Sequence, residues 1–102
     1  MIRRGEVWRY ESYVNRPGRT GLRLVVSADE VNGADRIPVV LALEVLDADP
    51  GGLLSVKLDE GSWASALSVV ACQKSRMAEL VATADDATME LVSSALRAVQ
   101  AL

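Results

Sequence analysis

The spacing of apolar residues changes near the C-terminal end of the chain, and this change constrains the fold more than any other sequence feature. Over most of the chain the apolar residues form short runs and alternations typical of strands, separated by glycine, proline, asparagine and aspartate. Near the end, Met89, Val92, Leu96 and Val99 follow one another at intervals of three or four, which places them on one helix face. The sequence therefore predicts a mainly β domain that ends in one amphipathic helix over residues 85–101.

The start of this helix is marked by polar residues. Thr83 and Asp86 have the spacing of a capping box, and Asp85 and Glu90 favour the positive N-terminal end of a helix dipole. We expect the apolar stripe of the helix to pack on the strands. A dimer interface is the alternative use of the same surface.

Five or six short strands are expected before the helix. Glu6–Tyr10 alternates polar and bulky residues, so Trp8 and Tyr10 should share one face of its sheet. The expected strands cover residues 6–10, 22–27, 37–46, 53–58, 66–72 and a short segment around 80–81. So many short strands in about eighty residues imply a closed or nearly closed β-barrel.

The longest apolar segment, residues 37–46, predicts a central strand buried on both faces. Glu44 interrupts it, and a buried acid must reach solvent or find a partner. The turn sequence Asp49-Pro50-Gly51-Gly52 follows and precedes the alternating segment 53–58. These features predict an antiparallel hairpin between segments 37–46 and 53–58.

Size and composition restrict the classes of protein that remain. A chain of 102 residues, half of them apolar and 25% charged, is expected to fold as a single domain over residues 1–102. The longest apolar run, Pro38–Leu43, is far shorter than a membrane span, so we expect a cytoplasmic protein. Cys72 is the single cysteine and histidine is absent, which excludes an intrachain disulfide, the usual zinc ligand sets and His-based triads. We expect no metal and no cofactor.

The charge distribution allows a nucleic-acid partner that the net charge of −3 would argue against. Residues 1–28 contain six arginines and only two acids, and the segment 11–21 is a basic loop by composition. A local phosphate-binding patch is one interpretation, because salt screens distant charges. Solvated arginines at strand edges are the other.

Several local strings, in this order, resemble the MazF/PemK family of toxins. The match spans nearly the whole chain, and each string is short. The strings are Arg4-Gly5-Glu6-Val7-Trp8, Gly21-Leu22-Arg23-Leu24-Val25-Val26-Ser27 with the later Asn32, Val39-Val40-Leu41-Ala42-Leu43-Glu44, Ser68-Val69-Val70-Ala71-Cys72-Gln73, and Ala95-Leu96-Arg97.

The resemblance implies an SH3-like barrel, a homodimer, and a toxin that cleaves single-stranded RNA and is silenced by a cognate antitoxin. In that family an arginine of the second strand and a threonine or serine at the end of the third carry the cleavage, with the ribose 2′-hydroxyl as nucleophile. Arg23 matches the arginine, although Leu24 follows it where the family usually has proline. Glu44 or Val45 stands where the threonine or serine is expected.

The chemistry of RNA cleavage assigns roles to these residues. Arg23 can stabilise the charge that builds on phosphorus, and Arg16 and Arg19 of the basic loop can hold neighbouring phosphates. Glu44 is either a general base or the structural ion-pair partner of Arg23. Arg23 and Glu44 are thus the candidate catalytic residues.

Further RNA contacts are expected from aromatic and basic residues. Trp8, Tyr10 and Tyr13 lie in or before the basic loop, where aromatic rings can stack on unpaired bases, although core packing is the commoner fate of Trp8. We single out Tyr13 as an RNA-binding candidate. Lys74 and Arg76 form a second small basic cluster that could also bind RNA.

Two other functions fit the same sequence. One is a gyrase poison like the related CcdB proteins, which act through their C-terminal helix and need no catalytic arginine. The other is a silenced MazF-like module that binds RNA or an antitoxin without cleavage. The state of Arg23 separates these readings, because an arginine locked to Glu44 could not serve RNA.

Overall fold

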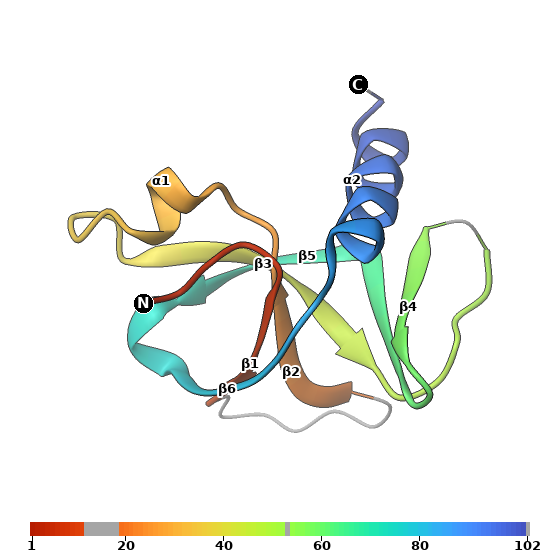
Figure 1. The fold of residues 1–102 in the computed structure, drawn as a ribbon, viewed down its shortest axis with the longest axis horizontal. Helices are drawn as coiled ribbons and strands as arrows, with labels where there is room; N and C mark the ends of the chain where they lie inside the picture. Colours follow the sequence, from red (N-terminus) through yellow and green to blue (C-terminus); the bar gives the residue numbers. More distant parts are fainter. Residues whose placement is uncertain (12–18, 53, 102) are drawn as a thin grey trace.

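The computed structural model describes residues 1–11, 19–52 and 54–101 (Figure 1). One small helix and a longer C-terminal helix accompany six strands and a short 3-10 turn. In chain order the elements are β1 (Glu6–Tyr10), β2 (Arg19–Val25), α1 (Asp29–Asn32), β3 (Val39–Leu46), β4 (Ser55–Asp59), β5 (Ser62–Gln73), η1 (Lys74–Arg76), β6 (Met77–Thr83) and α2 (Asp86–Gln100). The prediction of a mainly β protein with a C-terminal helix is confirmed.

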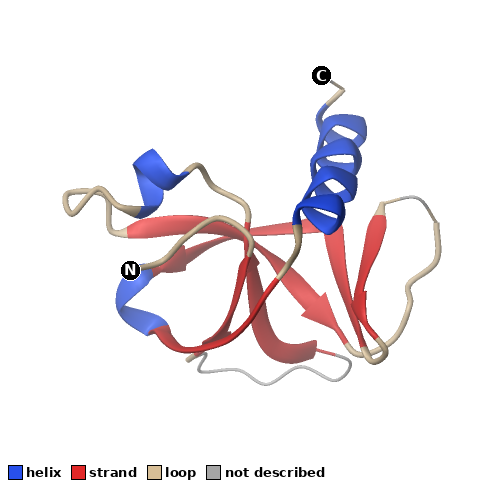
Figure 2. Ribbon diagram, in the orientation of Figure 1, coloured by secondary structure: helices blue, strands red, loops and turns tan. Residues whose placement is uncertain are grey.

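The strands form one antiparallel sheet in the order β4-β5-β3-β2-β1-β6. The sheet is strongly bent and twisted, and β4 and β6 are its two edges (Figure 2). Of the closed or nearly closed barrel that the sequence predicted, full closure is therefore wrong. Closure would require β4 and β6 to pair with each other. The gap between them is instead lined by the C-terminal end of β6 and the N-terminal end of α2.

The predicted hairpin between segments 37–46 and 53–58 is also wrong. β3 pairs with β2 and β5, whereas β4 pairs with β5, in a register that places Val56 opposite Ala64. The turn at residues 59–61 is short and is fixed by a hydrogen bond from Gly61 N to Asp59 Oδ1 (3.0 Å). A local hairpin of this kind costs less loop-closure entropy than pairing across the longer connection after β3. β5 is twelve residues long, which lets it serve both neighbours.

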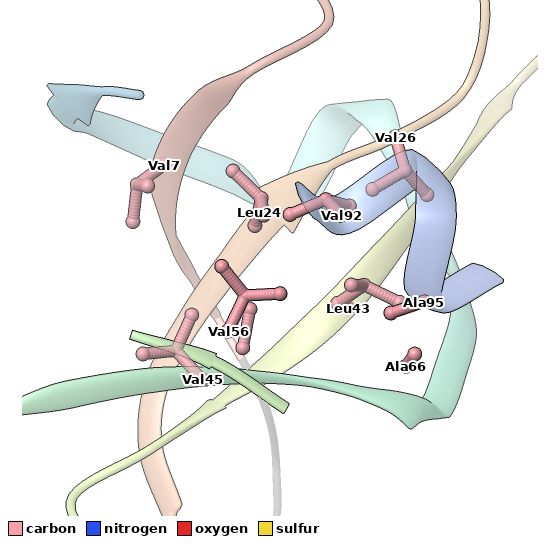
Figure 3. Packing of buried hydrophobic residues seen from close by; sticks show 10 residues of the cluster. Val7, Leu24, Val26, Leu43, Val45, Val56, Ala66, Val92 and Ala95 are labelled. Atoms are coloured by element: carbon pink, nitrogen blue, oxygen red, sulfur yellow. The ribbon is translucent and has the colours of Figure 1, made fainter. Parts of the chain in front are cut away.

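The first core cluster lies between one face of the sheet and α2 (Figure 3). All its buried members are aliphatic, and Leu24 and Val92 are fully buried. The members are Val7, Leu24, Val26, Leu43, Val45, Val56, Ala64, Ala66, Val92 and Ala95. The predicted packing of the helix stripe on the sheet is confirmed for Val92, Met89 and Leu96, while Val99 is exposed.

The helix begins with a different cap from the one expected. The carboxylate of Asp85 accepts a hydrogen bond from Thr88 N (2.8 Å), which makes Asp85 the N-cap residue. Thr83 is the last residue of β6, so its backbone belongs to the sheet rather than to the helix start. No helix in the described part of the chain is long and apolar enough to cross a membrane.

The connection between β2 and β3 is held by a small polar network. The turn expected near Asn32 contains α1, and buried Ser27 and Asn32 bond to each other, while Asn32 Nδ2 also donates to Asp29 Oδ1 (3.1 Å). The network anchors this connection to β3, because Leu41 N donates to Ser27 Oγ (3.1 Å). Asn32, a position of the family resemblance, therefore has a structural role here.

Candidate functional site

The candidate site lies on the sheet face opposite α2. Leu22 and Leu24 of β2 pack with the first core cluster, so Arg23 between them points to the other face. On that face lies the second core cluster, whose buried members are Val25, Val40, Ala42, Cys72 and Met77, with Ile2, Trp8, Tyr10 and Val70 packed against them. Arg23 thus comes from the middle of the sheet, at the border of an apolar surface.

The Arg23 guanidinium is half-buried and held on several sides. Its Nη1 donates to the carbonyl oxygen of Leu22 (3.0 Å), and its central carbon lies 5.1 Å from the ring centroid of Tyr10. Its Nε is buried without a hydrogen-bond partner among the residues that the structure describes. A desolvated donor on an always-charged group is costly unless an acceptor arrives, so this nitrogen suits an anionic ligand.

Glu44 lies directly opposite Arg23 in the register of β2 and β3. Its exposed fraction is 9%, so of the two outcomes that the sequence left open, solvent or a partner, this acid does not extend into solvent. The two candidate catalytic residues are therefore neighbours on one face of the sheet.

Cys72 completes this polar group from β5. Its side chain is 1% exposed, and burial raises the pKa of the thiol above its ordinary value. The nearby Arg23 cation partly offsets that rise, and the Glu44 carboxylate adds to it. The thiol therefore stays protonated at neutral pH, which makes it a poor nucleophile and an unreactive wall of the site.

The aromatic residues of β1 lie on the same face. The Tyr10 hydroxyl accepts a hydrogen bond from Gln73 N (3.2 Å), and Trp8 Nε1 donates to Glu6 Oε1 (3.1 Å). Both rings pack against the second core cluster, which confirms that Trp8 and Tyr10 share a face. The sequence alone did not connect Tyr10 with Arg23, although the two-residue alternation in both strands was a signal that could have placed them on one face.

The remaining predicted RNA-binding residues are placed unequally. Tyr13 and Arg16 lie outside the described residues, and of Arg19 only the backbone, which begins β2, is described. Lys74 is engaged in the fold, because its Nζ donates to the carbonyl oxygens of Val31 and Ala34 (2.8 Å each).

Arg76 is half-buried at the end of η1, and its carbonyl oxygen accepts a hydrogen bond from Glu11 N (2.9 Å). This bond ties the end of β1 to η1. The RNA contacts of all five residues, Tyr13, Arg16, Arg19, Lys74 and Arg76, stay predictions.

A pocket of 190 Å³ lies elsewhere, where the sheet stays open between β4 and β6. Its apolar walls belong to the first core cluster and its neighbours, and its polar rim includes Asp59 and the helix cap Asp85. It therefore opens on the α2 side of the sheet and not on the Arg23 side. Within the described ranges, no group of three His, Cys, Asp or Glu side chains could hold a metal ion.

Comparison with known proteins identifies the architecture. No protein-family model matches the sequence, and no curated protein matches it. Solved structures do match. An endoribonuclease from a mycobacterial species, in complex with its cognate antitoxin, has a TM-score of 0.86 at 18% identity over 100% of this chain and 97% of that one.

Two structures from Deinococcus radiodurans agree with this match. A chain of the MazE–MazF complex has a TM-score of 0.81 at 20% identity, and MazF alone has 0.76 at 21%, each over 99% of this chain and 97% of theirs. The chain therefore has the MazF fold, as the resemblance of its strands implied.

Proposed function

We propose that this protein is the toxin of a toxin–antitoxin pair and cleaves single-stranded RNA without a metal ion. The observation that carries the proposal is the half-buried Arg23, whose Nε is desolvated, with the buried Glu44 opposite it in the strand register of a MazF-type sheet. A fold alone does not define an activity, so the site residues must supply the chemistry.

Arg23 supplies stabilisation of negative charge. Attack of a ribose 2′-hydroxyl on the adjacent phosphate builds charge on the phosphoryl oxygens, and a guanidinium already held in place pays no reorganisation cost. The bond from Nη1 to the Leu22 carbonyl and the ring of Tyr10 fix this guanidinium before RNA binds. As the new bond from the 2′-oxygen to phosphorus forms, the bond from phosphorus to the 5′-oxygen would break. One fragment then ends in a 2′,3′-cyclic phosphate, and the other begins with a 5′-hydroxyl that has taken up a proton from solvent.

Glu44 is the proposed general base. It faces the same side of the sheet as Arg23 and is the carboxylate in register with it. A carboxylate can accept the 2′-hydroxyl proton, which is a task that a threonine or serine in its place could not perform alone. The departure from the family pattern at this position therefore suggests a different proton acceptor and not a loss of activity.

Two protein partners are part of the proposal. The mycobacterial neighbour was solved with its cognate antitoxin, and a Deinococcus neighbour with MazE. An acidic, extended antitoxin tail would suit the arginine-rich N-terminal region. A second copy of this chain is the other expected partner, and the exposed apolar side chains of Leu41, Leu67 and Val69 on β3 and β5 offer surface for protein contacts.

The test is cleavage of a long single-stranded RNA by the purified protein in the presence of a chelator. We expect discrete fragments with 2′,3′-cyclic phosphate ends, and a loss of at least about 100-fold in rate for Arg23→Ala. Arg9→Ala is the matched control, since Arg9 forms an exposed ion pair with Glu79 on the other face of β1. A folded wild-type protein that cuts no RNA would refute the proposal and direct attention to gyrase or to a silenced module.

A further inference from the structure

The ring of Tyr10 contacts the Arg23 guanidinium, which the sequence alone does not reveal. The two residues come from neighbouring strands that pair antiparallel, and both side chains lie on the face opposite α2. The Arg23 central carbon lies 5.1 Å from the Tyr10 ring centroid, within the range of a cation–π contact. The ring face is therefore occupied by the guanidinium and is not available there as a platform for a base.

The Tyr10 ring is itself held in place by a contact with a strand that is not its neighbour in the sheet. Its hydroxyl oxygen accepts a hydrogen bond from Gln73 N (3.2 Å), at the end of β5. Tyr10 also packs against the second core cluster, which limits the freedom of the ring to turn. A ring restrained by this packing and by the bond to its hydroxyl can fix a guanidinium more firmly than a surface aromatic could.

The ring adds a constraint that hydrogen bonds do not supply. Arginine has a long side chain whose rotamer freedom is lost when it must meet a phosphate in one geometry. The bond from Nη1 to Leu22 fixes one edge of the guanidinium, and the Tyr10 ring restricts one face. The remaining edge of the planar Arg23 guanidinium is then held in one orientation.

We propose that Tyr10 is a positioning residue that holds the Arg23 guanidinium for the phosphate of the RNA. The proposal rests on the proposed ribonuclease function and extends it to a residue of β1. Tyr10 acts through Arg23 and makes no contact with the reacting atoms. Its aromatic ring carries the effect, and its hydroxyl only secures the ring to β5.

The experiment compares Tyr10→Phe with Tyr10→Leu by steady-state cleavage of a short single-stranded RNA. Tyr10→Phe keeps the ring and is expected to cleave within about twofold of wild type. Tyr10→Leu should lose about tenfold in kcat with little change in KM, because phosphate positioning matters in the transition state. Val70→Ala is the control, since Val70 packs on the same cluster and should lower stability without changing kcat.

Each outcome decides the proposal. A folded Tyr10→Leu protein with wild-type kcat would overturn it, as would an equal loss in Tyr10→Phe. If the wild-type protein cleaves no RNA, the proposed function fails, and NMR of the Arg23 side chain then tests the positioning by itself. Ring-current shifts of the Arg23 signals should be kept in Tyr10→Phe and lost in Tyr10→Leu, and shifts unchanged in Tyr10→Leu would refute the contact.

Discussion

The two core clusters of this small protein differ in what they bury. The first cluster, under α2, has only aliphatic buried members, whereas the second borders Arg23 and Glu44 and includes the thiol of Cys72. Burial of apolar surface stabilises the fold, but burial of charge costs free energy unless the charges are paired or hydrogen-bonded. The difference indicates that the first cluster provides stability and that the second supports the site at some cost to it.

The strongest test of this division concerns Glu44. Glu44→Gln keeps the shape and removes the charge, so we expect a fall of about 100-fold in RNA cleavage if the carboxylate takes the 2′-hydroxyl proton. Stability should change much less than cleavage, because glutamine keeps the size of the side chain and an oxygen that can accept a hydrogen bond. The measurements are single-turnover cleavage and urea unfolding of the same samples.

A Glu44→Thr variant sharpens this test. Threonine is the residue that the MazF/PemK resemblance would place here. Cleavage by Glu44→Thr well above that of Glu44→Gln would mean that the site can also work in the family's manner. Unchanged cleavage in Glu44→Gln, with a large loss of stability, would instead make Glu44 a structural residue and contradict the division.

In the first cluster we expect a substitution to lower stability and to leave cleavage unchanged. Leu43 is 1% exposed among aliphatic neighbours, so Leu43→Ala should lower the free energy of unfolding by about 3 kcal/mol. Cleavage measured well below the unfolding temperature should stay close to wild type, because Leu43 faces away from Arg23. A strong loss of cleavage in a protein still folded would show that the two clusters are coupled.

The smallest effect is expected at the start of α2, which covers the first cluster. The Asp85 carboxylate accepts hydrogen bonds from Thr88, and these lower the pKa of Asp85 below its ordinary value. Its folded-state pKa is thus below its unfolded one, so its contribution to stability is present at neutral pH and is lost as the pH falls through the folded-state pKa.

Two variants separate the cap from its charge. Asp85→Ala should lower Tm at neutral pH by a few degrees and remove part of the acid sensitivity, whereas Asp85→Asn should keep the cap and lose only the acid sensitivity. Thermal unfolding followed by circular dichroism between pH 2 and about pH 7 measures both. Equal curves for Asp85→Asn and wild type over this range would contradict the assignment.

Local patterns predicted most of the secondary structure but few of the pairings. The alternation of Glu6–Tyr10 and the stripe of Met89, Val92 and Leu96 placed β1 and α2 with nearly the observed bounds. The hairpin expected after residue 46 failed, because strand pairing depends on which of several compatible strands closes the shorter loop. Nothing in the local sequence of β4 distinguishes β3 from β5 as its partner.

The site was predicted in part for the same reason. Arg23 and Glu44 stood out singly, one by its family position and the other by its charge within an apolar run, and the register of β2 and β3 brings them together. Tyr10 and Cys72 gave no such signal, since an aromatic and a thiol in alternating strands look like ordinary core residues. Their relation to Arg23 depends on β1 and β5, which approach it only in the folded sheet.

The sequence by itself determined the class of elements, their order and the two charged residues of the candidate site, because hydrophobic periodicity and residue chemistry are local properties of the chain. Only the tertiary structure decided that the sheet stays open, that β5 joins β3 to β4, and that Tyr10 covers the Arg23 guanidinium. These features arise from contacts between residues far apart in the chain. Their free energies depend on packing and loop closure, which no local pattern encodes.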